Sequence, residues 1–336
     1  GLRNHIRHAL DHPHACEPLR ELLTPGMKLT IAIDDISIPL PPMQSPDIRQ
    51  LVLEEVIELA ARRGVEDVKL YMANSLHRRM TADEIKHAVG ERVFRSFYPK
   101  DLKNHDAEDP ENLAYVGKTD QGEEVEINKR AMESDLLIYV NINLVAMDGG
   151  HKSVPVGLAS YRSVKHHHNV HTMLHSKSYM DPRPGRSAIH DSCKRMGDLL
   201  KTNGLKVFTI ETTLNNETFP DPFGFMNKRE WEWSLLEQGT YIAAKKANEM
   251  GPSQLKHQIW TRIQSPYGVT GVNAGETEAV HERTLARLHE QQLVEVQGQS
   301  DIMVVGIPYL TPYNVNSILN PILVHCMGLG YLFNMY

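Results

Sequence analysis

Histidines cluster between residues 166 and 175, where three are consecutive and two more follow. If this stretch is helical, His168, His171 and His175 recur at spacings of three and four residues and share one face. Imidazoles on one face are close enough to cooperate on a metal ion. A surface helix that tolerates histidine explains the same cluster, so the residues alone leave both interpretations open.

A glycine pair precedes a lysine directly after an apolar run. Residues 148–152 read Asp-Gly-Gly-His-Lys, and Gly149 and Gly150 permit a tight turn in which the backbone comes close to a ligand such as a phosphate. Lys152 would then lie beside that ligand. A plain turn followed by a solvated lysine is the alternative.

His77 lies outside this cluster, in the segment 74–79 between an apolar run and a helical pattern. Histidine is the natural general base near neutral pH, and a loop at the end of a strand can direct it at a substrate. A structural role is the alternative for His77. Further along, Asp106 could orient the imidazole of His105, although an ordinary polar loop explains this pair equally well.

Alternating apolar runs and helical patterns must position these residues. The predicted strands are Leu29–Ile33, Val68–Met72, Leu136–Asn141, Val207–Thr212 and Asp301–Gly306; the predicted helices include 46–63, one with the capping-box pair Thr81 and Glu84, and 276–291. This rhythm is typical of an α/β fold with mainly parallel sheets flanked by helices. Active sites in such sheets gather at the carboxyl ends of strands, where Asp34, Asp35 and His77 fall.

The length of 336 residues predicts two domains. We place a boundary near Gly251-Pro252, which gives an N-terminal catalytic domain over residues 1–250 and a C-terminal α/β domain over 251–336. A loop at 266–275 follows the boundary. We expect the second domain to be cut short, because the chain ends on an apolar run.

The bulk composition disfavours several classes of partner. A net charge of −6 with 41% apolar residues suits an enzyme and offers no basic surface for nucleic acid. The 3 cysteines lack paired spacing, which favours a reducing, cytoplasmic setting over a disulfide framework. The longest apolar stretch, 136–147, is shorter than a membrane span and is interrupted by asparagines, so we expect no membrane partner.

A series of landmarks, taken in order, resembles the lactate racemase family. These landmarks are Asp35 with Pro39-x-Pro41, Leu76-His77, Asn104-His105-Asp106, Gly149-Gly150-x-Lys152 with Pro155-x-Gly157, and His168. The resemblance covers most of residues 2–169 and returns weakly at 300–321. Each landmark is a weak signal alone, and their shared order carries the resemblance.

The resemblance implies an isomerase that racemises or epimerises a 2-hydroxy acid with a nickel-pincer nucleotide. In this cofactor a pyridinium-derived mononucleotide grips nickel through a ring carbon and two sulfurs. The family lysine that matches Lys152 can tether the cofactor, and the histidine that matches His168 supplies the remaining nickel ligand. One imidazole beside three such donors suits square-planar nickel.

The resemblance assigns roles to the other landmarks as well. Gly149 and Gly150 would let the loop close around the cofactor, and Asp35 matches a family aspartate near the active site. The histidine that matches His77 removes the hydroxyl proton of the substrate while hydride passes to the cofactor. The implied partners are a small hydroxy acid and, transiently, the enzymes that synthesise the cofactor.

The sequence departs from the family pattern at several positions. The family's second base falls shortly before the lysine, where residues 141–143 read Asn-Ile-Asn. The arginine usual before Pro39 is replaced by Ile38, and a family tyrosine and lysine align with Asn316 and Asn320. A small carboxylate would be held poorly without these cations.

We therefore expect a substrate larger or more hydroxylated than lactate, whose hydroxyls Asn141, Asn143 and Asn316 could bind. His151, His166 or His167 could replace the second base. Alternatively, hydride is transferred on one face only, which would make the protein an oxidoreductase.

Two readings lie outside this family chemistry. The histidine cluster with Asp34 or Asp35 could form the zinc site of a hydrolase. A diverged binding protein could keep the fold without catalysis, although the presence of both Lys152 and His168 argues against it.

Overall fold

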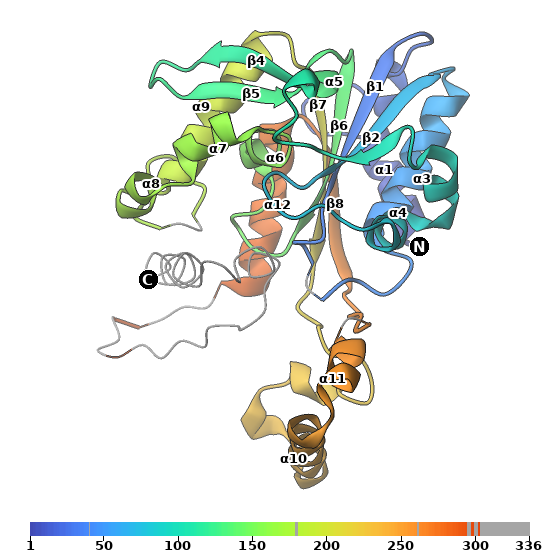
Figure 1. The fold of residues 1–336 in the computed structure, drawn as a ribbon, viewed down its shortest axis with the longest axis vertical. Helices are drawn as coiled ribbons and strands as arrows, with labels where there is room; N and C mark the ends of the chain where they lie inside the picture. Colours follow the sequence, from blue (N-terminus) through green and yellow to red (C-terminus); the bar gives the residue numbers. More distant parts are fainter. Residues whose placement is uncertain (40, 179–180, 261, 294–296, 299–301, 303–336) are drawn as a thin grey trace.

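A computed structural model of the chain describes residues 1–39, 41–178, 181–260, 262–293, 297–298 and 302. Its centre is a six-stranded sheet with the strand order β3-β2-β1-β6-β7-β8 (Figure 1). The strands are β1 (Lys28–Asp34), β2 (Asp67–Ala73), β3 (Leu102–Asn104), β6 (Leu136–Asn143), β7 (Val207–Leu214) and β8 (Val269–Gly275). Neighbouring strands run parallel, except that β8 is antiparallel to β7. The predicted α/β class with a mainly parallel sheet is confirmed.

The central strands are buried on both faces. Every residue of β6 is buried, and so is the interior of β1. Strands covered on both faces read as continuous apolar runs rather than as an alternating pattern. This is why the predicted strands at 29–33, 68–72, 136–141 and 207–212 coincide with β1, β2, β6 and β7.

The longer helices that flank the sheet begin at capping residues. Asp47 accepts a hydrogen bond from the backbone N–H of Arg49 at the start of α3, and Thr81 with Glu84 forms the predicted capping box of α4. The α-helices are α1 (Leu2–Asp11), α2 (Leu19–Leu22), α3 (Ile48–Arg62), α4 (Ala82–Phe97), α5 (Lys129–Met132), α6 (Ser153–Gly157), α7 (Tyr161–His167), α8 (Val170–Leu174), α9 (Ala188–Thr202), α10 (Leu235–Met250), α11 (Ser253–Trp260) and α12 (Thr277–Gln292). Short 3₁₀ turns are η1 (Pro110–Asn112), η2 (Gly150–Lys152), η3 (Gly224–Asn227) and η4 (Glu230–Glu232).

Helices cover the sheet on two faces (Figure 1). Helices α1, α3 and α4 pack on one face around Ile31 and Ile138. The other face carries a separate hairpin of β4 (Leu113–Lys118) and β5 (Glu124–Asn128), together with α6, α7 and α9, around Tyr139. Helix α12 covers this second face over β7, because Thr209, the register partner of Tyr139, bonds to it.

The edge of the sheet at β8 differs from the prediction. The expected loop at 266–275 is wrong for residues 269–275, which form β8. Glycine is required in this strand by a close approach, since a Cβ on Gly275 would lie 2.2 Å from the carbonyl oxygen of His14. The glycines that indicate a loop in the sequence therefore serve packing at a sheet edge.

The predicted domain boundary falls inside a connection between two strands of this sheet. Strand β8 follows Gly251-Pro252 and completes the sheet formed by the earlier strands, and helix α12 then packs against β7 and β8. The division into 1–250 and 251–336 stays a prediction. The predicted strand 301–306 and the positions Asn316 and Asn320 lie outside the described residues.

Between β7 and β8 the chain leaves the sheet and forms α10 and α11, which project away from the body (Figure 1). We call residues 219–264 the arm. Several of its apolar side chains are strongly exposed, with Leu235 at 86% and Met250 at 85%. Within the part of the chain that is described, no helix is long and apolar enough to cross a membrane.

Candidate active site

The two aspartates at the end of β1 are anchored by a buried arginine. The guanidinium of Arg49 donates to the backbone carbonyl oxygens of Asp34 at 2.9 Å and Asp35 at 2.7 Å. It also pairs with Asp47 at 2.7 Å and is only 3% exposed. Because a guanidinium holds its donors in a fixed fork, this anchor sets where both aspartates stand.

His77 and Asp35, which the sequence singled out separately, form a pair. Nδ1 of His77 lies 2.8 Å from Oδ2 of Asp35. A carboxylate accepts, so Nδ1 carries the proton and the lone pair of the neutral ring is on Nε2. Burial alone would raise the pKa of Asp35, but the hydrogen bonds of His77 and Ser37 lower it below its ordinary value. Asp35 is therefore a fixed negative charge that orients the imidazole of His77.

A tight turn presents His77. Its backbone N–H donates to the carbonyl oxygen of Asn74 at 2.7 Å, and Ser75 between them has a φ of 47°. Such left-handed backbone is uncommon outside glycine and is often found at functional sites.

The second aspartate, Asp34, has a different electrostatic setting. Its Oδ2 accepts the backbone N–H of Ile142 at 2.7 Å, which ties the ends of β1 and β6 together. Burial raises the pKa of Asp34 to about 7, despite this N–H, with further contributions from the negative charges of Asp35 and Asp148. Two neighbouring carboxyls thus have opposite pKa shifts.

The loop that follows β6 carries Lys152 and is fixed at both of its ends. The carboxylate of Asp148 accepts the backbone N–H groups of Leu144 and Val145, each at 3.0 Å. Gly149 and Gly150 follow with φ values of 80° and 60°. These glycines make the turn from which the 3₁₀ helix η2, with Lys152 as its last residue, begins.

His168 lies at the C-terminal end of α7, and a neighbouring histidine sets its tautomer. Nε2 of His167 lies 3.1 Å from the carbonyl oxygen of Pro155, which can only accept, so this nitrogen carries the proton. Nδ1 of His167 then accepts from Nδ1 of His168 at 2.6 Å. The lone pair of His168 is consequently on Nε2, where a metal ligand needs it.

The residues predicted from separate motifs meet in one region. The pKa of His168 is held well below its ordinary value by burial first, and then by the positive charges of His167, Lys152, His77 and His190. Both Lys152 and His77 are thus electrostatic neighbours of His168. A neutral His168 is in the protonation state that binds a metal ion.

Three buried asparagine atoms in the same region lack hydrogen-bond partners among the described residues. They are Oδ1 of Asn74, Nδ2 of Asn141 and Oδ1 of Asn143. All three side chains are at most 2% exposed. Because buried polar groups in native proteins are nearly always satisfied, these atoms indicate a polar ligand or bound water.

The predicted shared face of the histidine cluster is wrong. Helix α7 ends at His167 and α8 begins at Val170, so His168 is not on one continuous helix with His171 and His175. Across the described ranges, no three His, Cys, Asp or Glu side chains converge in a way that could hold a metal ion.

The remaining histidine landmarks have other neighbours. His105 is buried and bonds to the carbonyl oxygen of Ala159 at 3.0 Å, which is a structural role. The imidazole of His166 lies 3.7 Å from Glu124 of the hairpin, and that of His151 lies 3.7 Å from Glu278.

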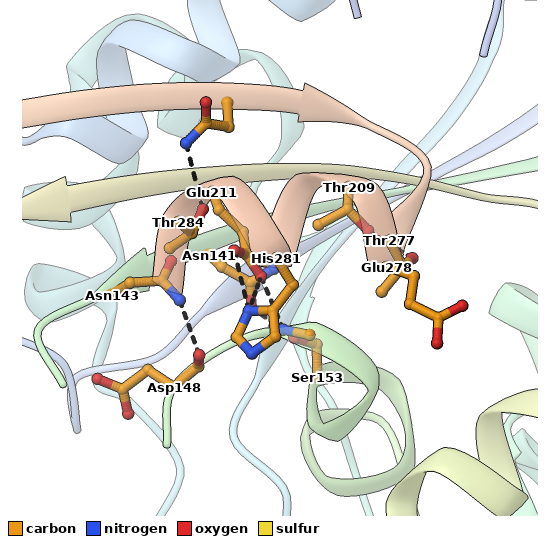
Figure 2. Close-up of polar contacts among 12 residues, drawn as sticks. Asn141, Asn143, Asp148, Ser153, Thr209, Glu211, Thr277, Glu278, His281 and Thr284 are labelled. Atoms are coloured by element: carbon orange, nitrogen blue, oxygen red, sulfur yellow. Dashed lines mark hydrogen bonds and ion pairs between the residues drawn. The ribbon is translucent and has the colours of Figure 1, made fainter. Parts of the chain in front are cut away.

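Sequence reasoning missed four residues of the site: Arg49, His190, Glu211 and His281. Glu211 of β7 is fully buried, accepts the backbone N–H of Gly150 at 2.7 Å and lies 3.2 Å from Nδ1 of His281 (Figure 2). A charged residue within an apolar strand was a usable signal, because buried carboxylates need partners. His281 and Arg49 give no such signal within their charged helices.

Comparison with known proteins gives the chain its relatives. The family model described as the lactate racemase N-terminal domain matches residues 2–181. The chain is 28% identical over 167 residues to a lactate racemase of Thermoanaerobacterium thermosaccharolyticum, which covers 48% of this chain and 37% of that protein. A lactate racemase of Lactiplantibacillus plantarum is 27% identical over 168 residues, 49% of this chain and 38% of that protein.

A solved structure, the lactate racemase apoprotein from T. thermosaccharolyticum, superposes with a TM-score of 0.54 at 19% identity, over 86% of this chain and 55% of that one. This likeness shows the fold. The chain matches little more than a third of the length of its curated relatives and about half of the solved structure.

Proposed function

The chain belongs to the family of the lactate racemase N-terminal domain, and from this premise we propose that it is a nickel-pincer nucleotide-dependent racemase or epimerase of a 2-hydroxy acid. The observation that carries the proposal is the set formed by the His77–Asp35 pair, Lys152 and the neutral His168. Asp35, His77 and the loop of Lys152 follow the neighbouring strands β1, β2 and β6, at whose carboxyl ends ligands of parallel sheets bind, and His168 is an electrostatic neighbour of Lys152 and His77.

The residues present fit the cofactor. Lys152 would tether it at the end of the glycine turn, and Nε2 of His168 would be the protein ligand of nickel. The orphaned atoms of Asn141 and Asn143 leave buried polar groups for a bound molecule to satisfy. When bound, a nickel-pincer nucleotide supplies a reversible acceptor of hydride.

His77 would handle the proton of the substrate hydroxyl. Its tautomer places the lone pair on Nε2, and Asp35 stabilises the imidazolium that forms when this nitrogen accepts the proton. The same imidazolium returns the proton to the oxygen when the alcohol is restored.

The polar groups of the site favour a hydroxylated substrate. Ile38 cannot bind a carboxylate, and the guanidinium of Arg49 is already engaged by Asp47 and by backbone carbonyl oxygens. The amide groups of Asn74, Asn141 and Asn143 can exchange hydrogen bonds with hydroxyls. We therefore expect aldonic acids to be better substrates than lactate.

A second candidate, one-sided hydride transfer, is favoured by the asparagines at the position of the family's second base. An oxidoreductase would accumulate the keto acid and would need a hydride donor, whereas a racemase yields the opposite stereoisomer without any donor. Chiral chromatography of the products distinguishes the two.

The cofactor is tested by intact mass and nickel analysis of protein produced with and without the cofactor-synthesis enzymes. We expect stoichiometric nickel and an added mononucleotide mass in the wild type, and the loss of both in Lys152→Ala and His168→Ala. His171→Ala, which removes an exposed imidazole of the same cluster, is the matched control and should keep both. Metal-free protein under all conditions would refute the proposal.

Activity is tested on the loaded protein with the stereoisomers of lactate and of gluconate. Conversion of one stereoisomer into another, dependent on His77, supports the proposal. A nickel-loaded protein that only oxidises these substrates would instead establish the one-sided reaction.

A further inference from the structure

Inversion of a stereocentre requires proton transfer on two faces of the substrate, and β6 offers only asparagine where the family has its second base. Asn141 pairs in register with Glu211 of β7, so the two side chains leave the sheet on the same face, side by side. A carboxylate that is fully buried thus lies next to the position of the missing base.

Glu211 is paired with an imidazole from α12. Nδ1 of His281 lies 3.2 Å from each oxygen of the Glu211 carboxylate. Figure 2 shows the ring of His281 with this nitrogen turned to Glu211 and the opposite edge turned away. Because the carboxylate accepts, Nδ1 carries the proton and the lone pair of the neutral ring is on Nε2. Nε2 has no hydrogen-bond partner within the described part of the chain, and the ring remains 12% exposed.

This pair adjoins the loop that carries Lys152. One oxygen of Glu211 accepts the backbone N–H of Gly150 at 2.7 Å. A Cβ on Gly149 would lie 2.3 Å from that oxygen, and one on Gly150 would lie 2.6 Å from the ring of His281. The two glycines are therefore needed so that the carboxylate and the imidazole can reach the turn, a reason that the sequence did not reveal.

Electrostatic neighbours connect His281 with the rest of the site. The pKa of His190 is lowered to about 3 by burial first, and both Lys152 and His281 lower it further. His190 in turn is a neighbour of His168, as is His77. The two histidines that carry a carboxylate partner are thus connected through His190 and the predicted nickel ligand His168.

We infer that His281, oriented by Glu211, is the second proton-transfer base of the proposed reaction. The other histidines considered for this role lack such an orienting carboxylate: His167 supports His168, while His166 and His151 lie 3.7 Å from Glu124 and Glu278, beyond hydrogen-bond distance. The inference rests on the proposed function, because it assigns a residue to one of its two faces.

The step is balanced as follows for the stereoisomer that His281 serves. The hydroxyl O–H bond breaks, and its proton moves to Nε2 while the C–O bond becomes a carbonyl. The hydride released from carbon is the one that the cofactor class named above accepts. Inversion follows when hydride returns to the opposite face of the carbonyl carbon and the imidazolium of His77 supplies a proton to the oxygen. His281 then exchanges its proton with water, so no further oxidant or reductant is consumed.

The test compares His281→Ala with the wild type, both loaded with nickel, using whichever stereoisomer of lactate or gluconate the wild type converts. We expect kcat for stereoisomer conversion to fall roughly 10²- to 10⁴-fold, with an unchanged nickel content and added mass. Imidazole supplied in the buffer should restore part of the lost rate, which a purely structural defect would not allow. His289→Ala removes an exposed imidazole from the same helix and should behave like the wild type.

Glu211→Gln distinguishes the orientation of His281 from the support of the loop before Lys152, because glutamine can still accept the Gly150 N–H but carries no charge. We expect it to keep nickel and to lose kcat, with little change in KM. Loss of nickel in both variants would overturn the inference and make the pair a support for the loop. Full activity of His281→Ala, or a lost activity that imidazole does not restore, would overturn it as well.

Failure of the proposed function looks different. In that case the wild type itself carries no nickel or converts no stereoisomer, and the inference falls with it.

Discussion

His77 with Asp35 and His281 with Glu211 place the same two chemical groups at different strands of one sheet. Asp35 holds its histidine through one oxygen at 2.8 Å, while its other oxygen accepts from Ser37. Glu211 shares both oxygens with His281 at 3.2 Å and also accepts a backbone N–H from Gly150. Asp35 thus orients only the imidazole of His77, whereas Glu211 orients His281 and also holds the turn before Lys152.

The largest expected effect concerns whether both pairs transfer protons. His77→Gln should lower kcat for stereoisomer conversion by roughly 10²- to 10⁴-fold, the usual contribution of a positioned base, and His281→Gln should lower it to a similar degree. Stopped-time chiral chromatography from each pure stereoisomer measures both. A loss confined to His77→Gln would break the comparison and leave the protein with a single base.

The surroundings of the first pair predict a pH dependence of stability. The folded pKa of Asp34 is about 7, above its value of about 4 in an unfolded chain, so the folded state holds the extra proton between these values. Stability should therefore fall as pH rises from about 4 to about 7, by roughly 4 kcal/mol from this group.

Asp34→Asn, which can still accept the Ile142 N–H, should remove this fall. Urea unfolding of both proteins at a series of pH values isolates the contribution, because the other titrating groups are common to the two. Parallel pH curves for the two proteins would contradict the raised pKa.

The surroundings of the second pair predict a steric effect. Gly149→Ala should lower the free energy of unfolding by roughly 2 to 4 kcal/mol, because a Cβ would meet the Glu211 carboxylate and the backbone conformation suits only glycine. Gly185→Ala is the matched control: its φ is 70° but open space surrounds it, so roughly 1 kcal/mol of backbone strain is expected. Equal losses in urea denaturation would show that Glu211 does not crowd the turn.

The smallest effect concerns His167, whose Nδ1 accepts from the predicted nickel ligand His168. His167→Phe fills the same buried space but cannot accept from Nδ1 of His168, so nickel affinity should fall roughly 10- to 100-fold. Nickel release to a chelator, followed by metal analysis, measures this change. His166→Phe alters an adjacent histidine that faces Glu124 and should release nickel at the wild-type rate.

The comparison also separates what the sequence could predict from what it could not. His77 and Asp35 follow apolar runs that are recognisable locally, and neighbouring parallel strands bring their ends together. Glu211 and His281 lie in a strand and a helix whose contact depends on β8 running antiparallel at the sheet edge, in a segment that the sequence analysis interpreted as a loop. Pairing of this kind is tertiary and leaves no short-range pattern.

The histidine cluster shows a different limit of prediction from sequence, because the segment was recognised but its structure was not. Its spacing suggested one helical face, but the helix ends at His167, and a capping box at Asn169 begins the next one. The role of His167 depends on the position of the Pro155 carbonyl oxygen, which no spacing rule predicts. Local composition therefore indicated the segment that contains His168, but it did not indicate which contacts each histidine of the cluster makes.

The arm leaves and re-enters the body at adjacent points. The hydroxyl of Ser265 donates to the carbonyl oxygen of Thr218 at 2.5 Å, and Leu214 pairs with Val269 at the ends of β7 and β8. Antiparallel strands need only a short turn to connect them, and closing a shorter loop costs less entropy. A tight turn could therefore replace residues 219–264 and leave the six-stranded sheet with its flanking helices intact. The same junction offers a site for inserting a reporter domain.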